Sequence, residues 1–264
     1  MAKRDDLSGK VVWITGASSG LGKALAQECA LQGAQVVLTA RRLDELEKVR
    51  VSLLNPDQHI SVCADITDES QVRRAYEQVL QQKGRIDWLI NNAGFGLHST
   101  VLDRSEIDIQ ARAFDAMCLA VLILGGAAGR AMRARGSGRI VNVASTSAAI
   151  YTGNYSAVKA WARTYSTALQ LELRGTGVTV TGLLPGWVRT EFHDRAGINA
   201  SKLPGFVWIE ADKLVRSCLA DAEKGRIESI PDLKWKIAMF IGDHGPRGLA
   251  RLVSRMLTAS RKKH

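Results

Sequence analysis

Val11-Val-Trp-Ile-Thr-Gly-Ala-Ser-Ser-Gly-Leu-Gly22 is a β-branched run that leads directly into a glycine-rich loop. Helical periodicity follows from Leu21 through Leu25 to Cys29, until Gly33 ends it. Glycines allow the backbone to turn sharply and to approach a pyrophosphate, whose charge is favourable at a helix N-terminus. A strand before the loop and a helix after it are the context that such a motif requires. The stretch therefore predicts a dinucleotide-binding loop at the start of an α/β sheet.

Apolar runs alternate with helical stretches along the rest of the chain. Strands are expected at 11–15, 35–39, 60–64, 88–90, 140–143, 178–184 and 226–230. Helices are expected at 21–29, 43–54, 68–83, 104–134 and 155–174. This alternation indicates a parallel sheet covered on both faces. A (β/α) barrel is the alternative, but the glycine loop favours an open, doubly wound, Rossmann-type sheet of about seven strands in a single domain.

Composition sets the class of protein. The chain has 264 residues, of which 46% are hydrophobic and 23% are charged, as in a globular protein with a substantial core. No run of 18 or more apolar residues appears, so no membrane-spanning segment is expected, and the N-terminal residues are not expected to be a secretory signal. The four cysteines form no Cys-x-x-Cys pair, so buried reduced thiols in a cytoplasmic protein are expected. No metal-ligand spacing is visible.

The net charge of +10 is concentrated in the C-terminal part. Residues 234–264 contain eight Lys or Arg and one acidic residue, Asp243. We expect the main domain to cover residues 1–245 and a basic amphipathic tail to cover 246–264. In this tail Leu249, Leu252, Val253 and Met256 share one face, and Arg247, Arg251 and Arg255 lie near the other. The tail suits either an anionic membrane surface or packing on the body or a second subunit. Nucleic-acid binding is disfavoured because no recognition motif accompanies the charge.

The end of the second expected strand indicates the type of dinucleotide. NAD sites place a carboxylate there for the ribose 2′-hydroxyl, whereas NADP sites place a cation for the 2′-phosphate. The sequence reads Ala40-Arg41-Arg42, without a carboxylate. Since an arginine fork suits a phosphate, NADP(H) is the expected cofactor.

Tyr155 and Lys159 stand four residues apart, so on a helix they share a face. A free phenol has a pKa of about 10, too high for ready proton exchange at neutral pH. A nearby ammonium favours the phenolate and lowers that pKa. The spacing therefore suits a general acid with its electrostatic partner.

With these motifs in view, residues 8–230 resemble a short-chain dehydrogenase/reductase. The similarity rests on Thr15-Gly-x-x-x-Gly-x-Gly22, Asn91-Asn-Ala-Gly94, Tyr155-x-x-x-Lys159 and Pro185-Gly-Trp-Val-Arg-Thr190, which occur in the family's order. The resemblance implies that Tyr155 is the acid/base, Lys159 its partner and Ser145 the anchor of the substrate oxygen. It implies cofactor contacts by Gly16, Ser18, Ser19, Gly20, Leu21, Gly22, Arg41, Arg42, Asp65, Ile66, Asn92, Ala93, Gly94, Tyr155, Lys159, Pro185, Gly186, Val188 and Thr190.

Two positions depart from the family's pattern. Ser145 precedes Tyr155 by only ten residues, a short interval for the family, and Ser147 is a less favoured alternative to it. Met117, or Cys118 after a shift of one, stands where family members usually have an asparagine. Neither sulfur side chain replaces the hydrogen bonds of an amide.

The resemblance also places a substrate lid at 190–208. Phe192, Leu203, Phe206 and Trp208 suit a partly apolar pocket or packing of the lid, and His193 is expected to be a polar lid residue. The helix from Tyr155 to Arg174 is expected to pair subunits in a homodimer or homotetramer.

The sequence therefore predicts an NADP(H)-dependent oxidoreductase that interconverts a small carbonyl compound and its alcohol. The alternative is an NADP-binding protein with weakened or lost catalysis that acts as a sensor or scaffold, which the methionine at position 117 would favour.

Overall fold

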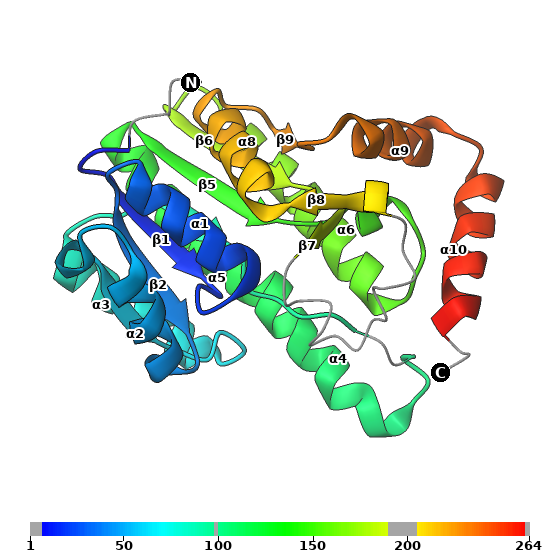
Figure 1. Ribbon diagram of the computed structural model, residues 1–264, viewed down its shortest axis with the longest axis horizontal. Coiled ribbons are helices and arrows are strands. Elements are labelled where there is room, and N and C mark those ends of the chain that lie inside the picture. Colours follow the sequence, from blue (N-terminus) through cyan, green and yellow to red (C-terminus); the bar gives the residue numbers. More distant parts are fainter. Residues whose placement is uncertain (1–6, 98–99, 190–204, 262–264) are drawn as a thin grey trace.

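The computed structural model describes residues 7–97, 100–189 and 205–261. Its centre is a seven-stranded parallel sheet with helices on both faces (Figure 1), which confirms the doubly wound architecture. The strand order is β3-β2-β1-β4-β5-β6-β9, so the sheet has two edges and the barrel alternative is excluded. The strands are β1 (Val11–Thr15), β2 (Gln35–Ala40), β3 (Ile60–Cys63), β4 (Trp88–Asn91), β5 (Gly138–Val143), β6 (Val178–Leu183) and β9 (Glu228–Ser229).

The helices cover the sheet in two layers. On one face α1 (Gly20–Leu31), α2 (Leu43–Ser52) and α8 (Ala211–Glu223) supply the core, and on the other face α3 (Glu69–Lys83), α5 (Ala120–Arg135) and α6 (Asn154–Glu172) do so. Strand β1 shows why such a strand reads as a continuous apolar run. Ile14 packs into the first layer and Trp13 into the second, and both are fully buried.

Short elements complete the chain. Among them are two short strands, β7 and β8, which pair in parallel. β7 precedes and β8 follows the segment 190–204, and that segment lies outside the described residues. The elements are the 3-10 turns Pro56–Gln58, Arg104–Glu106, Thr146–Ala149 and Gly205–Val207, the helices α4 (Ile107–Phe114), α9 (Leu233–His244) and α10 (Arg247–Arg261), and the strands β7 (Trp187–Arg189) and β8 (Trp208–Glu210).

Most expected elements lie where the sequence placed them, and Asp68 caps α3 by accepting from the backbone N–H groups of Ser70 and Gln71. Two expectations were wrong in part. The last strand, expected at 226–230, shrinks to the two residues of β9. The long helix expected at 104–134 is divided by a π-helical turn at Asp115–Leu119 between α4 and α5.

The cysteines are all free, and Cys29, Cys118 and Cys218 are buried as expected. Cys63 is exposed, which corrects the expectation for that residue. It is the last residue of β3, at the edge of the sheet, and its thiol donates to the carbonyl of Arg41.

The helical run Arg104–Arg135 is the one stretch among the described residues with the length and hydropathy of a membrane-spanning helix. Half of its apolar window is buried, and α5 packs against α3 and the sheet, as a core helix does.

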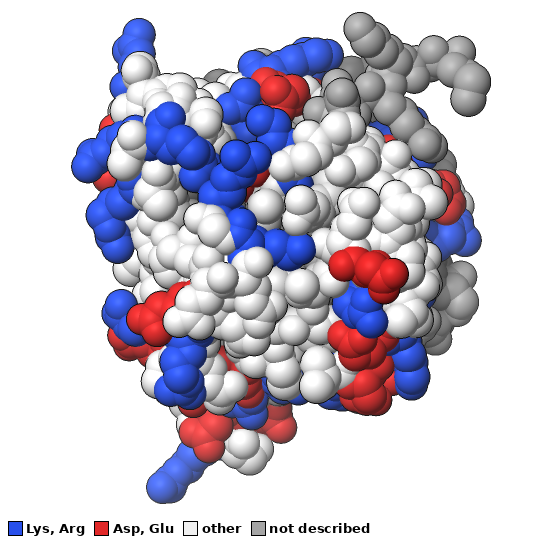
Figure 2. Space-filling view, turned by 90° about the vertical axis from the view of Figure 1, so that its left-hand side faces the viewer, with Lys and Arg blue, Asp and Glu red and all other residues white. Residues whose placement is uncertain are grey.

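Basic side chains are not confined to the C-terminal segment. On the face that Figure 2 shows, lysines and arginines gather in the upper left part, whereas acidic and basic residues mix in the lower part. This face lies at the end of the molecule away from α9 and α10 (Figure 1). Counts of charged residues along the sequence placed most of the excess positive charge in the C-terminal part. They did not reveal that basic residues also gather on this face.

Candidate active site

From β1 the chain adds β2 and β3 toward one edge of the sheet, and it then returns to add β4, β5 and β6 toward the other edge. Open α/β sheets bind ligands at such a switch point, here between β1 and β4, beyond the carboxyl ends of the strands. The loop after β1 depends on its glycines. Gly16 and Gly20 have φ angles of +66° and +53°, in the left-handed region that favours glycine. Residues 18–21 lie half-buried around the start of α1.

Two of these glycines also allow close packing of the loops after β1 and β4. A β-carbon on Gly16 would lie 2.7 Å from the α-carbon of Ala93. One on Gly22 would overlap the carbonyl oxygen of Gly16 and lie 2.6 Å from Nδ2 of Asn92. Any larger residue would therefore disrupt the loop predicted to hold the pyrophosphate.

Asn92 ties these two loops together. Its Nδ2 donates to the carbonyl oxygens of Thr15 at 2.9 Å and Gly16 at 3.1 Å. The backbone N–H groups of Asn92 and Ala93 both donate to the Thr15 hydroxyl. Asn92 thereby shapes the glycine loop.

The preceding asparagine points into the protein instead. Asn91 donates to Asn142 at 2.9 Å, and Asn142 donates to the Ser166 hydroxyl at 3.0 Å. All three are buried. This chain links β4, β5 and α6, and it was not predicted from the sequence.

The candidate catalytic residues come from the end of β5 and the start of α6. Lys159 is buried, and its Nζ donates to the carbonyl oxygen of Val143 at 2.7 Å. The same Nζ lies 5.8 Å from the ring centroid of Tyr155, within the range of a cation–π contact. Burial lowers the pKa of Lys159 to about 8, although the neighbouring Cys118 raises it slightly. Proximity of the two side chains agrees with their predicted partnership.

Ser145 follows β5 by two residues and is also buried. Its hydroxyl accepts from the backbone N–H of Ser147 at 3.1 Å and caps the 3-10 turn that begins at Thr146. The turn fixes the hydroxyl oxygen, which retains its own proton for donation. Ser147 makes this contact through its backbone and therefore serves to hold Ser145.

The π-helical turn brings Met117 and Cys118 to Lys159. A β-carbon on Gly94 would lie 2.8 Å from Sδ of Met117 and 3.8 Å from Nζ of Lys159, so the three residues meet at one point. Cys118 is buried, and burial raises the pKa of its thiol to about 11, against the opposing influence of Lys159. Tyr155 packs against the same cluster. Single π-turns are rare and occur often at functional sites.

Arg41 and Arg42, predicted to hold a phosphate, are exposed after β2. Neither forms an ion pair with a residue that the structure describes. Asp65 lies nearby, beyond the adjacent strand β3, and accepts from the backbone and hydroxyl of Thr67. Its second oxygen pairs with Arg112 of α4 at 3.3 Å, a contact that the sequence pattern did not indicate. Ile66 is half-buried and packs on the core clusters that include Val62 and Met117.

The Pro185–Gly186 turn after β6 is held by a residue far along the chain. A β-carbon on Gly186 would overlap the indole of Trp235, which belongs to α9. Its indole Nε1 is buried, and no residue that the structure describes accepts a hydrogen bond from it. Val188 is buried in β7 and pairs with Ile209 in β8.

Of the lid predicted at 190–208, the structure describes only the part from 205 onward, together with the residues that precede it. Trp187 and Trp208 meet edge to face with ring centroids 5.9 Å apart, so an aromatic pair joins the two flanks of segment 190–204. The side chain of Phe206 and the whole of residues 190–204 lie outside the described residues, and with them Thr190, Phe192, His193 and Leu203.

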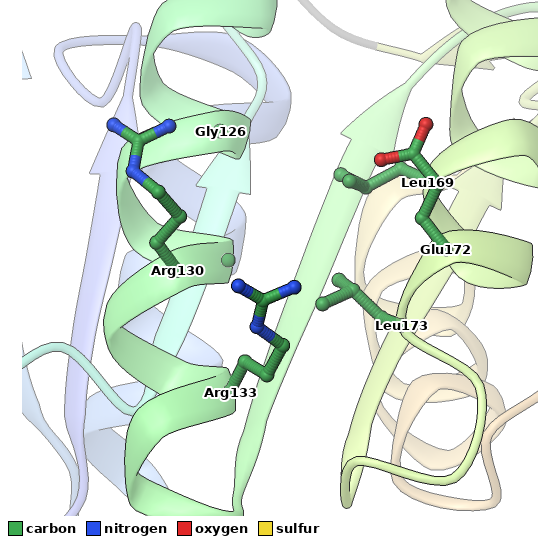
Figure 3. A pocket seen from close by; sticks show the side chains of 7 residues that line it. Gly126, Arg130, Arg133, Leu169, Glu172 and Leu173 are labelled. Carbon is green, nitrogen blue, oxygen red and sulfur yellow. The ribbon is translucent and has the colours of Figure 1, made fainter.

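A groove lies elsewhere, between α5 and α6. Figure 3 shows Arg130 and Arg133 on α5, and across from them Leu169 and Glu172 on α6 and Leu173 directly after it. Gly126 and Gly129 supply no side chains, which leaves the floor of the groove open. None of these residues was predicted to bind cofactor.

Comparison with known proteins agrees with this architecture. A family model for the short chain dehydrogenases matches residues 10–199. A "Dehydrogenase/reductase SDR family protein 7-like" from Anopheles gambiae is 37% identical over 195 residues, which cover 70% of this chain and 61% of that protein. The chain thus spans less than two thirds of the length of this relative.

Two further proteins match over more of their length. A 3-ketodihydrosphingosine reductase from Bacteroides thetaiotaomicron is 35% identical over 218 residues, with 79% of this chain and 74% of that protein covered. A short-chain dehydrogenase from Sphingobium yanoikuyae, solved in complex with NADPH, has a TM-score of 0.79 and 31% identity, with 91% of this chain and 94% of that chain covered.

Proposed function

Since this chain belongs to the short-chain dehydrogenase family, we propose that it is an NADP(H)-dependent oxidoreductase that interconverts a carbonyl compound and its alcohol. The observation that carries the proposal is the buried ammonium of Lys159 beside the ring of Tyr155. A buried charge is costly, so its retention next to a phenol points to chemistry at that phenol.

The residues present fit a nicotinamide dinucleotide. Gly16 and Gly22 leave a cradle without β-carbons after β1, next to the first turn of α1. The exposed guanidinium groups of Arg41 and Arg42 stand after β2 and support a 2′-phosphate, hence NADP(H). The NADPH complex of the Sphingobium relative is consistent with this choice.

A bound nicotinamide supplies or accepts the hydride at the substrate carbon. In the reduction, Tyr155 gives its proton to the carbonyl oxygen, and the resulting phenolate is stabilised by the Lys159 ammonium. Ser145 donates a hydrogen bond to the same oxygen and orients it. The reverse reaction uses the phenolate as the base. The proton thus passes directly between Tyr155 and the substrate oxygen, without a free hydroxide or hydronium ion.

The aromatic side chains that flank segment 190–204 favour a substrate with apolar groups. Trp187 and Trp208 line the two ends of segment 190–204, and Trp235 lies against the Pro185–Gly186 turn. We infer that ketones or aldehydes with apolar substituents are favoured. The name of the Bacteroides relative, a 3-ketodihydrosphingosine reductase, agrees with a ketone.

The test is NADPH oxidation across a panel of ketones and aldehydes, with Tyr155→Phe as the blank. Turnover that disappears in Tyr155→Phe supports the reductase. The alternative, a cofactor-binding sensor, draws on the buried Met117 thioether beside Lys159, which offers no strong hydrogen bond. It predicts tight NADPH binding, no turnover and no effect of Tyr155→Phe. Met117→Asn then shows whether this side chain limits catalysis.

We also propose a homodimer or homotetramer in the cytoplasm. The helices α5 and α6 carry the exposed apolar residues Leu122 and Leu171, and the groove of Figure 3 lies between them. Such a surface suits a second copy of the chain.

A further inference from the structure

The helices α9 and α10 form the far right-hand end of the molecule in Figure 1, away from the central sheet. We propose that this end is a docking surface for an anionic lipid membrane. The proposal concerns a surface outside the candidate active site and does not depend on the reaction.

Helix α9 is apolar on two opposite sides. Its inner side carries Trp235 and the buried Met239, and Gly242 lies so close to Ala149 that a β-carbon would approach to 2.8 Å. At 3.6 residues per turn, the opposite side carries a second apolar stripe. The stripe consists of Leu233, Ile237, Phe240 and Ile241, all of which are exposed.

A soluble surface helix needs only one apolar side, facing the core. The outer stripe of α9 is therefore not explained by folding of the chain itself. By the same helical geometry Lys236 lies exposed along one side of it, whereas Lys234 on the other side pairs with Asp232 and donates to the carbonyl of Trp208, both at 3.2 Å. Lysines beside an apolar stripe can extend their ammonium groups to the head groups of a bilayer while the stripe lies deeper.

Helix α10 repeats this arrangement. Ser254 is buried and anchors the helix, since its hydroxyl accepts from the backbone N–H of Tyr151 at 2.8 Å. Leu252 and Met256 lie on the opposite side of the helix and are 55% and 67% exposed. Arg251 and Arg255 are exposed beside them. The structure does not describe the side chains of Arg247 and Leu249.

Charge decides which partner suits this surface. Residues 234–264 contain eight Lys or Arg, and their one carboxylate, Asp243, is bound by Arg163 of α6 at 2.7 Å. The acidic group thus pairs with the body, and among the side chains of this segment that the structure describes, the cations of Lys236, Arg251 and Arg255 are exposed. A second copy of the chain would bring like charges together, and a nucleic acid would leave the apolar stripes exposed to water. Anionic lipid head groups over an acyl layer complement both features.

The surface adjoins the substrate side of the protein. Gly242 and Ser254 contact Ala149 and Tyr151, in the segment that runs from Ser145 to Tyr155. A membrane docked here would lie next to that segment.

The test is co-sedimentation of the full-length protein with phosphatidylcholine vesicles that contain or lack phosphatidylglycerol. Binding is expected only with phosphatidylglycerol and is expected to weaken as salt screens the charges. Arg251→Gln/Arg255→Gln should weaken binding about 30-fold, because each cation near such a surface contributes about 1 kcal/mol. Arg73→Gln/Arg74→Gln on α3 removes the same charge elsewhere and should leave binding unchanged.

The apolar stripe is tested by Ile237→Ser/Phe240→Ser, which should weaken binding by roughly tenfold or more. The control Val51→Ser/Leu54→Ser, in the last turn of α2 and just beyond it, removes side chains of similar exposure, 59% and 54% against 52% and 65%. Absence of binding to anionic vesicles, or equal losses in variants and controls, overturns the proposal. So does a change of molecular mass in Ile237→Ser/Phe240→Ser by light scattering, which would assign the stripe to a second copy.

Discussion

At the scale of single residues, Lys159 is the side chain whose environment departs most from its sequence expectation. The i, i+4 spacing predicted a partner for Tyr155, and the two side chains do lie together. Spacing could not show that the ammonium is fully buried or that it donates to Val143. Those properties arise from the packing of α6 on the end of β5.

Burial of the Lys159 ammonium is expected to lower the stability of the folded protein, while the same ammonium supports the proposed chemistry of Tyr155. Folding lowers its pKa from 10.5 to about 8, a difference that corresponds to roughly 3 kcal/mol. Below pH 8 both states hold the proton, so the folded protein bears this cost in full. Between about 8 and 10.5 only the unfolded state keeps the proton, and the cost declines as the pH rises.

Lys159→Met without cofactor should therefore be more stable than the wild type at pH 7 by up to about 3 kcal/mol, less about 1 kcal/mol for the lost hydrogen bond. Its advantage should shrink by pH 10, and turnover should be lost. Urea unfolding at the two pH values measures both. A wild type that is the more stable protein at pH 7, or a difference independent of pH, would contradict the assignment.

At the scale of elements, the ends of the strands were predictable and their connections less so. Strands β1, β2 and β4 are buried along almost their whole length, so they appear as apolar runs, whereas the edge strand β3 is only partly buried. The π-turn at Asp115–Leu119 was not predicted, and it lies where Met117 meets Gly94, a contact between residues distant in the sequence. Contacts between distant residues, such as that of Trp235 with Gly186, leave no periodic signal in the sequence.

The turn between β2 and α2 carries the cofactor prediction. Arg41→Ala/Arg42→Ala should raise the Kd for NADPH at least roughly tenfold, since one hydrogen bond to a charged group contributes about 1.5–3 kcal/mol. The Kd for NADH should change little, because NADH lacks the 2′-phosphate. Fluorescence titration with both cofactors distinguishes the cases. An equal rise in both Kd values would show that the arginines do not select the phosphate.

Arg163 connects α6, β9 and α9. It binds Glu228 at 2.6 Å and Asp243 at 2.7 Å, and only 21% of its side chain is exposed. The Arg163 guanidinium lowers the pKa of Asp243, so this contribution is present at neutral pH and is lost as the pH falls through the carboxyl's lowered pKa.

Arg163→Gln should lower the free energy of unfolding at pH 7 by roughly 2 kcal/mol and speed amide hydrogen exchange in α9. The exposed pair of Arg73 with Glu69 is the control, and Arg73→Gln should cost less than about 1 kcal/mol. Unchanged exchange in α9 would show that other contacts hold the helix.

At the scale of the whole molecule, the sequence predicted the layers and the order of the motifs because glycines, buried strands and strand-end polar residues all follow local rules. It did not predict how the C-terminal part is arranged. A tail was expected at 246–264, where the structure has α10, and the sequence did not indicate the second apolar stripe that begins at Leu233 on α9. Only the structure shows that Met239 faces the body while Phe240 faces outward.

The proposed oligomeric state is a property of the whole molecule. We expect light scattering to give the mass of two or four chains, and Leu122→Arg/Leu171→Arg to give single chains, because two charges would then enter the proposed apolar contact. Leu102→Arg, which changes the most exposed leucine on another surface, is the control. A wild-type mass of one chain would contradict the proposed oligomer without affecting the proposed reaction.

Transfer of a deuterium label from NADPH to the substrate carbon would test the proposed reaction and the role of Tyr155 in one experiment. NADPH deuterated at the reactive C4 position is incubated with the protein and each active ketone or aldehyde, and the product alcohol is examined by mass spectrometry. One deuterium is expected on the carbinol carbon with the wild type and none above background with Tyr155→Phe, although both bind NADPH. Label transfer of equal rate in Tyr155→Phe would contradict the role of Tyr155. Tight NADPH binding without label transfer to any carbonyl compound would contradict the proposed reaction.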